Sequence, residues 1–373
     1  MTVHDIAYVE LYTSNKKSAV DYFVSSMGFS RVAEAVGVDH SSALLRQGTV
    51  QLAVTTGPAT WRFLGEHGDG IADIALTCDD VEEAVRSAVA AGATVTGPGQ
   101  SRMGLAQGNP AVSAFGGTTH TLLPRDHGPA AGPPPGRNWT TLPDASLQDT
   151  SLPDAAAPEA PGPEAPEQDA PSGPHTGRIQ LLDHIAVCLE GATLDKYGDF
   201  YRDAFGMSCY SSEYVDVGAH AMDSVVMRSS SGRVTFTLVA PDPGKGTGQL
   251  DAFLERNGGP GVQHLAFLVE DIIPTVREYR DRGMEFLTVP DTYYDSLEKR
   301  LPGMRAEVGM LRSAQVLADR DEWGDLLQLF SRSPYERNTL FYELIQRRGS
   351  RGFGSSNIRA LYEAVERDRL TAE

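Results

Sequence analysis

The sequence GPGVQHLAFLVEDIIPTVREYRDRGMEF at residues 259–286 repeats the pattern of GDGIADIALTCDDVEEAVRSAVAAGATV at residues 68–95. Each stretch begins with apolar residues typical of a buried strand and continues with apolar residues at helical spacing. Each then reaches a glycine, which suits the left-handed conformation that ends many helices. The same strand and helix therefore occur twice in the chain, which indicates an internal duplication.

The duplication extends outward on both sides of these stretches. The strand-like sequence IAYVELYT at residues 6–13 parallels LDHIAVCLE at residues 182–190. Further along, SSALLRQGTVQLAV parallels DSVVMRSSSGRVTFTLV, and GGTTHTLLPR parallels RNTLFYELIQR. The pattern predicts an α+β fold of two tandem domains, in which paired βαβββ units form an open, barrel-like sheet around a cavity.

The boundary between the two halves is a segment of unusual composition. Residues 126–178 are dominated by Pro, Ala, Gly, Glu and Asp, which bury little surface and rarely join helices or ladders. We predict a first domain at residues 1–125, a partly disordered linker at residues 126–178 and a second domain at residues 179–373. The helical pattern NIRALYEAVERDRL has no counterpart in the first half and is expected to close the second cavity.

Composition and charge exclude several classes of protein. The length of 373 residues suits two domains, and the formal net charge of −18 disfavours nucleic acids and anionic membranes as partners. The three cysteines, Cys78, Cys188 and Cys209, form neither a disulfide framework nor a CxxC motif. No signal-peptide pattern opens the chain, and no apolar run approaches the roughly 20 residues of a membrane span. We therefore expect a soluble, cytoplasmic protein.

Aligning the two halves pairs three polar positions on predicted strands: Tyr8 with His184, Asp73 with His264, and Thr121 with Glu343. Two imidazoles and one carboxylate on one inner face form the facial triad of non-haem Fe(II) oxygenases, which leaves open positions on the metal. A single histidine in a strand is more often structural, and the other histidines, His120 among them, are interpreted that way. Three metal-ligating residues at repeat-equivalent positions are unlikely to arise by chance, and a buried carboxylate without a cation is costly. We predict His184, His264 and Glu343 as metal ligands and catalytic residues.

Six motifs of the second half are shared with a known family: LDHIAV, GPGVQHLAF, YYDSL at Tyr293–Leu297, DLLQLF, TLFYELIQRRG and GFGSSNIRALYEAVE. In these motifs the chain resembles the 4-hydroxyphenylpyruvate dioxygenase and 4-hydroxymandelate synthase family of the vicinal oxygen chelate superfamily. With a weaker match of the first half, the resemblance covers nearly the whole chain outside the linker. It implies the vicinal oxygen chelate fold, Fe(II) held by the three predicted ligands, and oxidative decarboxylation of 4-hydroxyphenylpyruvate by O2.

The two activities of this family diverge after decarboxylation. The dioxygenase hydroxylates the ring and gives homogentisate, whereas the synthase hydroxylates the benzylic carbon and gives 4-hydroxymandelate. Where dioxygenases have GNF and PINEP, this chain has SNI at residues 356–358 and TLVAP at residues 237–241. The departures at Thr237, Val239 and Ile358 resemble the synthase, which feeds 4-hydroxyphenylglycine into peptide antibiotics. The alternative activity is that of the dioxygenase. Neutral drift among core residues also produces apolar-for-aromatic substitutions of this kind.

The resemblance also implies a substrate pocket. Three glutamines would orient the substrate carboxylate and the metal ligands, Ser224 would bond the phenol, and two phenylalanines would hold the ring. The predicted substrate-binding residues are Ser224, Thr237, Val239, Gln249, Gln263, Gln328, Phe341, Phe353 and Ile358. Tyr342 has no assigned role, because strand alternation points its side chain away from the metal.

Two further classes of function remain open. Superfamily members include metal-free binding proteins, which would have no need for three ligands around open metal positions. An extradiol ring-cleaving dioxygenase would need acid–base residues beside the metal, which the Phe, Ile and Gln lining does not favour. The first half keeps the fold without the ligands, so we expect a structural role or an oligomer interface, and a homodimer is left open.

Overall fold

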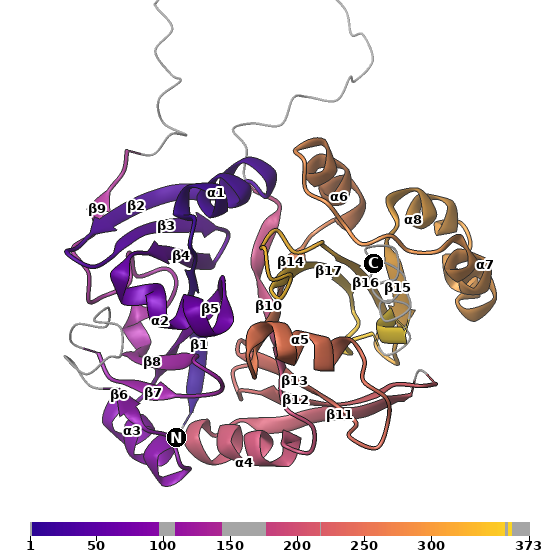
Figure 1. The fold of residues 1–373 in the computed structure, drawn as a ribbon. Coiled ribbons are helices and arrows are strands. Elements are labelled where there is room, and N and C mark those ends of the chain that lie inside the picture. Colours follow the sequence, from indigo (N-terminus) through magenta and orange to yellow (C-terminus); the bar gives the residue numbers. More distant parts are fainter. Residues whose placement is uncertain (1, 97–108, 144–176, 217, 355–356, 360–373) are drawn as a thin grey trace, which may run out of the picture.

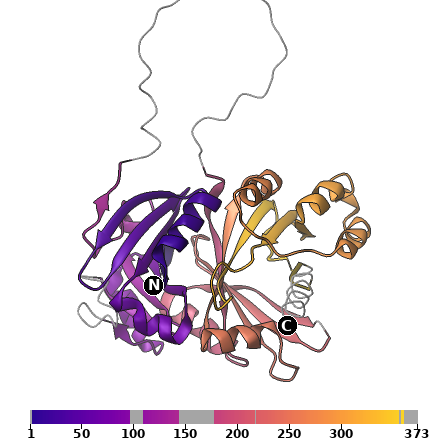
Figure 2. The ribbon, with the colours of Figure 1, turned by 45° about the horizontal axis from the view of Figure 1, so that its top comes forward.

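The computed structural model describes residues 2–96, 109–143, 177–216, 218–354 and 357–359. In this part of the chain each half builds one large curved sheet, and the two sheets lie side by side (Figure 1). Helices pack on the outside of each sheet and across its open end, as a second view shows (Figure 2).

The first sheet has nine strands in the order β6-β7-β8-β5-β1-β4-β3-β2-β9. Their bounds are β1 (Val3–Tyr12), β2 (Ser30–Val36), β3 (Ser41–Gln47), β4 (Val50–Thr56), β5 (Gly70–Cys78), β6 (Val95–Thr96), β7 (Ala111–Ser113), β8 (Thr119–Pro124) and β9 (Thr140–Thr141). The helices of this half are α1 (Lys16–Asp21), which continues into the π-helical turn η1 (Tyr22–Ser26), α2 (Trp61–His67) and α3 (Val81–Ala90). Short 3-10 turns, η2 (Pro58–Thr60) and η3 (Arg125–His127), precede α2 and follow β8.

The second sheet has eight strands in the order β11-β12-β13-β10-β14-β17-β16-β15. Their bounds are β10 (Ile179–Cys188), β11 (Ser208–Asp216), β12 (Ala221–Arg228), β13 (Thr235–Pro241), β14 (Gly261–Val269), β15 (Leu317–Arg320), β16 (Asp325–Phe330) and β17 (Phe341–Arg348). The helices are α4 (Leu194–Phe205), α5 (Gln249–Asn257), α6 (Ile272–Asp281), α7 (Asp291–Arg300) and α8 (Val308–Ala314), with a 3-10 turn η5 (Pro302–Met304) between the last two.

The two sheets repeat each other strand by strand. In reverse, the strand order of the second sheet is β15-β16-β17-β14-β10-β13-β12-β11, which corresponds strand by strand to β6-β7-β8-β5-β1-β4-β3-β2 of the first sheet. The central pairs also run in the same directions: β1 and β10 are parallel to β4 and β13, and antiparallel to β5 and β14. The register matches as well, because Tyr8 pairs with Ala75 while His184 pairs with Ala266. The predicted α+β fold of duplicated, barrel-like sheets is therefore confirmed.

Part of the predicted linker belongs to the first sheet. Strand β9 lies inside residues 126–178 and pairs antiparallel with β2, with Thr141 opposite Ala33. Close by, the buried Arg137 forms an ion pair with Glu10 at 2.5 Å. Proline-rich composition predicts disorder on average, but these contacts order the part as far as residue 143. Residues 144–176 of the linker, and residues 360–370 of the expected closing helix, lie outside the described residues, whereas residues 357–359 are helical.

A continuous hydrophobic core joins the two halves. Phe23 of the first half packs edge-on against Tyr342 of β17, with ring centroids 5.2 Å apart. The start of β10 is held by the first half, because Ile179 N donates to Gln47 Oε1 at 2.6 Å and Thr49 N donates to Gln180 O at 2.8 Å. None of the helices in the described ranges combines the length and apolarity needed to cross a membrane.

Candidate metal centre and substrate pocket

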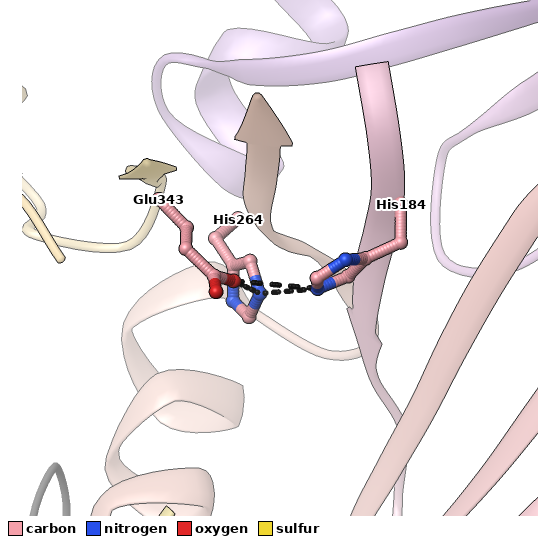
Figure 3. Close-up of side chains that lie close together, drawn as sticks. All are labelled: His184, His264 and Glu343. Atoms are coloured by element: carbon pink, nitrogen blue, oxygen red, sulfur yellow. Dashed lines mark hydrogen bonds and ion pairs between the residues drawn. The ribbon is translucent and has the colours of Figure 1, made fainter. Parts of the chain in front are cut away.

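Three adjacent strands bring the predicted metal ligands together. His184 lies on β10, His264 on β14 and Glu343 on β17, and these strands are hydrogen-bonded neighbours in that order. All three side chains project to the inner face of the sheet, where they point at one another (Figure 3). Each is buried, with at most 9% of the residue exposed. Strand pairing thus gathers residues that are far apart in the sequence.

The donor atoms have the spacing of a metal site. His184 Nε2 lies 3.3 Å from His264 Nε2 and 3.3 Å from Glu343 Oε2, and His264 Nε2 lies 3.2 Å from Glu343 Oε2. Three donors at right angles around a cation, each about 2.1 Å from it, are roughly 3 Å apart. Two nitrogen donors and one oxygen donor in this arrangement fit Fe(II) and leave one side of the metal open.

Hydrogen bonds fix which ring nitrogen faces the centre. His184 Nδ1 donates to Asp183 Oδ1 at 2.9 Å, and His264 Nδ1 lies 3.2 Å from Gln263 Oε1. Arg347 in turn holds Asp183 with two bonds of 2.7 Å, one to each carboxylate oxygen. Each Nε2 atom therefore faces the centre, where it would supply its lone pair to a bound cation, as metal-bound histidines do.

The third ligand is also oriented by neighbours. Gln328 Nε2 donates to Glu343 Oε1 at 2.7 Å, which leaves Oε2 facing the two histidines. Asn357 Nδ2 donates to Gln328 Oε1 at 2.8 Å, and Asn357 Oδ1 accepts from Tyr293 Oη at 2.8 Å. A chain of amide and hydroxyl groups thus connects α7 and residue 357 to the carboxylate.

The charge state of Glu343 suits a cation ligand. Burial alone raises the pKa of this carboxyl, but the adjacent His184 and His264 outweigh burial and bring the pKa down to about 2. For His184, burial lowers the pKa, yet Glu343 and Asp183 raise it to about 9. The site therefore holds an ionised carboxylate at neutral pH and concentrates negative charge around the two imidazoles.

Aromatic and aliphatic side chains surround the three donors. Phe341 stacks on the His264 ring at 5.0 Å between centroids, and Phe353 meets the His184 ring edge-on at 5.2 Å. Ile358 packs against an apolar cluster that includes Val239, and the other buried members of this cluster are Cys188, Met222, Leu250 and Phe253. Two of the three positions at which the sequence departs from the dioxygenase motifs thus share one apolar cluster.

The remaining predicted pocket residues occupy β12, β13 and α5. Ser224 pairs with Val239 across β12 and β13, and its Oγ donates to Glu213 O at 3.3 Å. Thr237 Oγ1 is buried without a hydrogen-bond partner among the described residues. Gln249 begins α5, directly before Leu250 of the apolar cluster.

Three residues of the site escaped the sequence reasoning: Asp183, Arg347 and Asn357. All three lie within the family motifs, and for Asp183 and Arg347 the sequence position already indicated a place near the metal centre. Asp183 directly precedes a predicted ligand, and Arg347 follows Glu343 by four positions, so both lie on strands that carry ligands. The pairing of their charges across β10 and β17 appears only once the sheet is assembled.

Among the described residues of the first half, the equivalent region holds no such ligand set. Asp73, the counterpart of His264, accepts bonds from Thr119 Oγ1 at 2.8 Å and Thr121 N at 3.0 Å. Burial and then the nearby Glu10 raise the pKa of Asp73 to about 7. The ion pair of Arg137 with Glu10 adds a buried positive charge to this region. The first half thus fills its inner face with its own polar network.

Comparison with known proteins agrees with the fold. The N-terminal family of hydroxyphenylpyruvate dioxygenase matches residues 1–130, and the glyoxalase/bleomycin resistance protein/dioxygenase superfamily matches residues 181–300. A 4-hydroxyphenylpyruvate dioxygenase from Aspergillus fumigatus is 30% identical over 97% of this chain and 92% of its own length. One from Yarrowia lipolytica is 29% identical over 97% of this chain and 91% of its own length.

Solved structures extend the comparison. A triple mutant of 4-hydroxymandelate synthase from Streptomyces coelicolor is 45% identical, with a TM-score of 0.81, and 98% of this chain and 99% of that chain are covered. A fusion of a xylose isomerase-like TIM barrel with 4-hydroxyphenylpyruvate dioxygenase has a TM-score of 0.71 at 21% identity, with 98% of this chain and 53% of that chain covered. This second likeness supports the fold alone.

The duplicated sheets, the candidate ligand triad and these relatives together define a non-haem Fe(II) dioxygenase of the vicinal oxygen chelate class. Within that class, the chain belongs to the 4-hydroxyphenylpyruvate dioxygenase family, which includes 4-hydroxymandelate synthase.

Proposed function

We propose that this enzyme is a 4-hydroxymandelate synthase, which converts 4-hydroxyphenylpyruvate and O2 into 4-hydroxymandelate and CO2. The observation that carries the proposal is the apolar cluster that Val239 and Ile358 share. An aliphatic side chain at residue 358 has no flat ring to hold the substrate ring in one plane. The 45% identity to a 4-hydroxymandelate synthase supports the same choice.

We assign His184, His264 and Glu343 as the ligands of Fe(II), which when bound supplies open positions for the 2-oxo acid and for O2. The chain supplies orientation around these ligands. Asp183 and Gln263 hold the two imidazoles, and Gln328 holds the carboxylate. These contacts keep three donors preorganised at the spacing that the metal requires, which limits the cost of binding.

The pocket residues position the substrate ring and exclude water. Phe341 and Phe353, which contact the two histidine rings, present flat apolar surfaces to an aromatic substrate. We assign Thr237, whose hydroxyl has no partner among the described residues, and Ser224 to hydrogen bonds with the substrate. Gln249, Val239 and Ile358 complete the proposed pocket. An apolar wall beside the benzylic carbon favours reaction there over attack on the ring.

We also propose a division of labour between two domains, residues 1–125 and 179–373. The second domain carries the whole ligand triad, and the first domain is structural. Within the segment between them, residues 126–143 pack on the first sheet.

A second candidate is 4-hydroxyphenylpyruvate dioxygenase, which gives homogentisate, because relatives such as those from Aspergillus fumigatus and Yarrowia lipolytica carry that name. The deciding experiment is aerobic turnover of 4-hydroxyphenylpyruvate with Fe(II) and ascorbate, with products separated by liquid chromatography and identified by mass spectrometry. We expect 4-hydroxymandelate. Homogentisate as the main product would replace the proposal with the second candidate, and absence of any product would point to a binding protein.

A further inference from the structure

A cavity between the two halves of the chain is separate from the candidate metal centre. Its volume is about 1270 Å³, and its walls come from β1, the β3–β4 turn, the residues after β8, the start of β10 and the β12–β13 turn. None of the three proposed iron ligands lines it. Asp183 and Phe353, which contact His184, stand on its wall and so lie between the cavity and the metal centre.

The walls of this cavity are rich in arginine: Arg46, Arg125, Arg228, Arg233, Arg347 and Arg351. Against these six arginines the lining contains three aspartates, Asp5, Asp126 and Asp183, which leaves a formal excess of three positive charges. The chain as a whole has a formal net charge of −18. Positive charge is therefore concentrated here against the trend of the molecule.

Two of these arginines have unused donors. The Nε atoms of Arg46 and Arg228 are buried without a hydrogen-bond partner among the described residues. Arg233 and Arg347, by contrast, form ion pairs with Asp5 at 3.1 Å and with Asp183 at 2.7 Å. Within the described part of the chain, the Nη2 atoms of Arg46 and Arg228 make only long contacts to backbone carbonyls, to Gly132 O at 3.5 Å and Gly232 O at 3.3 Å. Arg46 and Arg228 line the cavity and, among the described residues, pair with no carboxylate, so an anion in the cavity would supply the charge partner that both guanidinium groups lack.

The cavity also presents apolar surface. Leu181 of β10 is 39% exposed, and Leu182 and Leu268 beside it in the lining are only partly buried. Inorganic ions make no use of such walls, whereas a molecule with an apolar body and an acidic group matches both features. Arg46 belongs to β3 and Arg228 ends β12, so each half of the chain contributes one of the two arginines.

We propose that this cavity is a binding site for a small organic acid, whose carboxylate is bound through Arg46 and Arg228 and whose apolar part lies against Leu181, Leu182 and Leu268. The site is distinct from the substrate pocket, and the proposal does not depend on which product the enzyme makes.

The test is isothermal titration of the iron-loaded enzyme with 4-hydroxyphenylacetate, an aromatic acid that lacks the 2-oxo group. Loss of a charged hydrogen bond is expected to weaken binding at least about tenfold in R46Q and in R228Q. The matched control is R86Q on α3, where Arg86 is exposed and pairs with Glu83, and its affinity should equal that of the wild type. R46K and R228K keep the positive charge and should bind the acid with intermediate affinity. If a glutamine variant fails to fold, the corresponding lysine variant is compared with the wild type instead.

Two further probes separate the contributions of charge and apolar surface. The uncharged analogue 4-hydroxyphenylethanol should bind much more weakly than the acid, and inorganic phosphate should bind more weakly than the acid as well. Unchanged affinity in both glutamine variants would place the acid at the metal centre and overturn the proposal. Equal binding of the uncharged analogue, or binding of phosphate without binding of the acid, would overturn it too. Product identity is measured separately, so failure here leaves the proposed reaction standing.

Discussion

The Nε2 atoms of His184 and His264 lie 3.3 Å apart although 80 positions separate the two residues in the chain. Adjacent antiparallel strands create this proximity, since β10 pairs with β14 and Ala186 stands opposite His264. In water two such imidazoles would not remain at this distance. The sheet therefore holds the ligands in place for a cation to bind between them and Glu343.

Replacing His264 with Ala should abolish iron binding and activity, because two donors remain where three are needed. The loss should exceed the 10–100-fold typical of changes to residues behind the ligands. Iron content by atomic spectroscopy and turnover of 4-hydroxyphenylpyruvate check this. His220→Ala is the control, since His220 lies in a loop and contacts Gly246 O. Turnover by the His264 variant at wild-type iron content would refute the triad assignment.

Replacing Asp183 with Asn should weaken iron binding by about 10–100-fold, because the imidazole of His184 loses its carboxylate partner. The change also leaves Arg347 facing a neutral amide, and breaking a buried ion pair costs about 3–5 kcal/mol of stability. Iron titration at a temperature where the variant is folded separates the two effects. Asp199→Asn is the surface control, because Asp199 pairs only with the exposed Arg202. An unchanged iron affinity would mean that Asp183 is only structural.

Replacing Ile358 with Phe should move the product from 4-hydroxymandelate toward homogentisate. The added ring would stand beside Val239 in the apolar cluster and restrict the substrate ring. The ratio of the two products by mass spectrometry is the measurement, and Ile358→Leu, which keeps an aliphatic side chain, should leave it unchanged. The same ratio in the Phe variant would show that residue 358 does not steer the reaction.

The junction between the halves should lose stability in acid through His120. Burial lowers the pKa of this imidazole from 6.5 to about 4 and outweighs the hydrogen bond to Ile74 O at 3.1 Å, which raises the pKa. The other ring nitrogen lies 3.0 Å from Tyr201 Oη of the second half. The unfolded chain therefore binds the proton more readily. The contribution of the neutral His120 to the free energy of unfolding is therefore complete above pH 6.5, and it declines by about 3 kcal/mol as the pH falls to 4.

Urea unfolding at a series of pH values from 4.5 to 7.5 checks this dependence. The variant His120→Gln, which has no titrating group at this position, should show a smaller change of stability with pH than the wild type. Parallel pH profiles for the two proteins would count against His120 as the source.

Much of the fold and the candidate site could be predicted from the sequence, because duplication aligns each strand with a counterpart. His184, His264 and Glu343 were predicted in this way, and the register of β1 and β10 agrees with that alignment. The pairing of Arg347 with Asp183 could not, since it depends on how β17 and β10 pack at long range. The contact of Arg137 with Glu10 could not be predicted either, because the proline-rich composition of residues 126–178 indicated disorder where residues 126–143 are ordered.

The first half holds the beginning of β10 through Gln47 and Thr49, and His184 follows on the same strand. Loosening of the first half would release the end of that strand and disturb the angle at which His184 meets the metal. Iron retention during gradual denaturation should therefore serve as a reporter of the first half, even though that half contributes none of the proposed ligands. A domain that contributes none of the proposed ligands can in this way set the temperature at which the enzyme loses its cofactor.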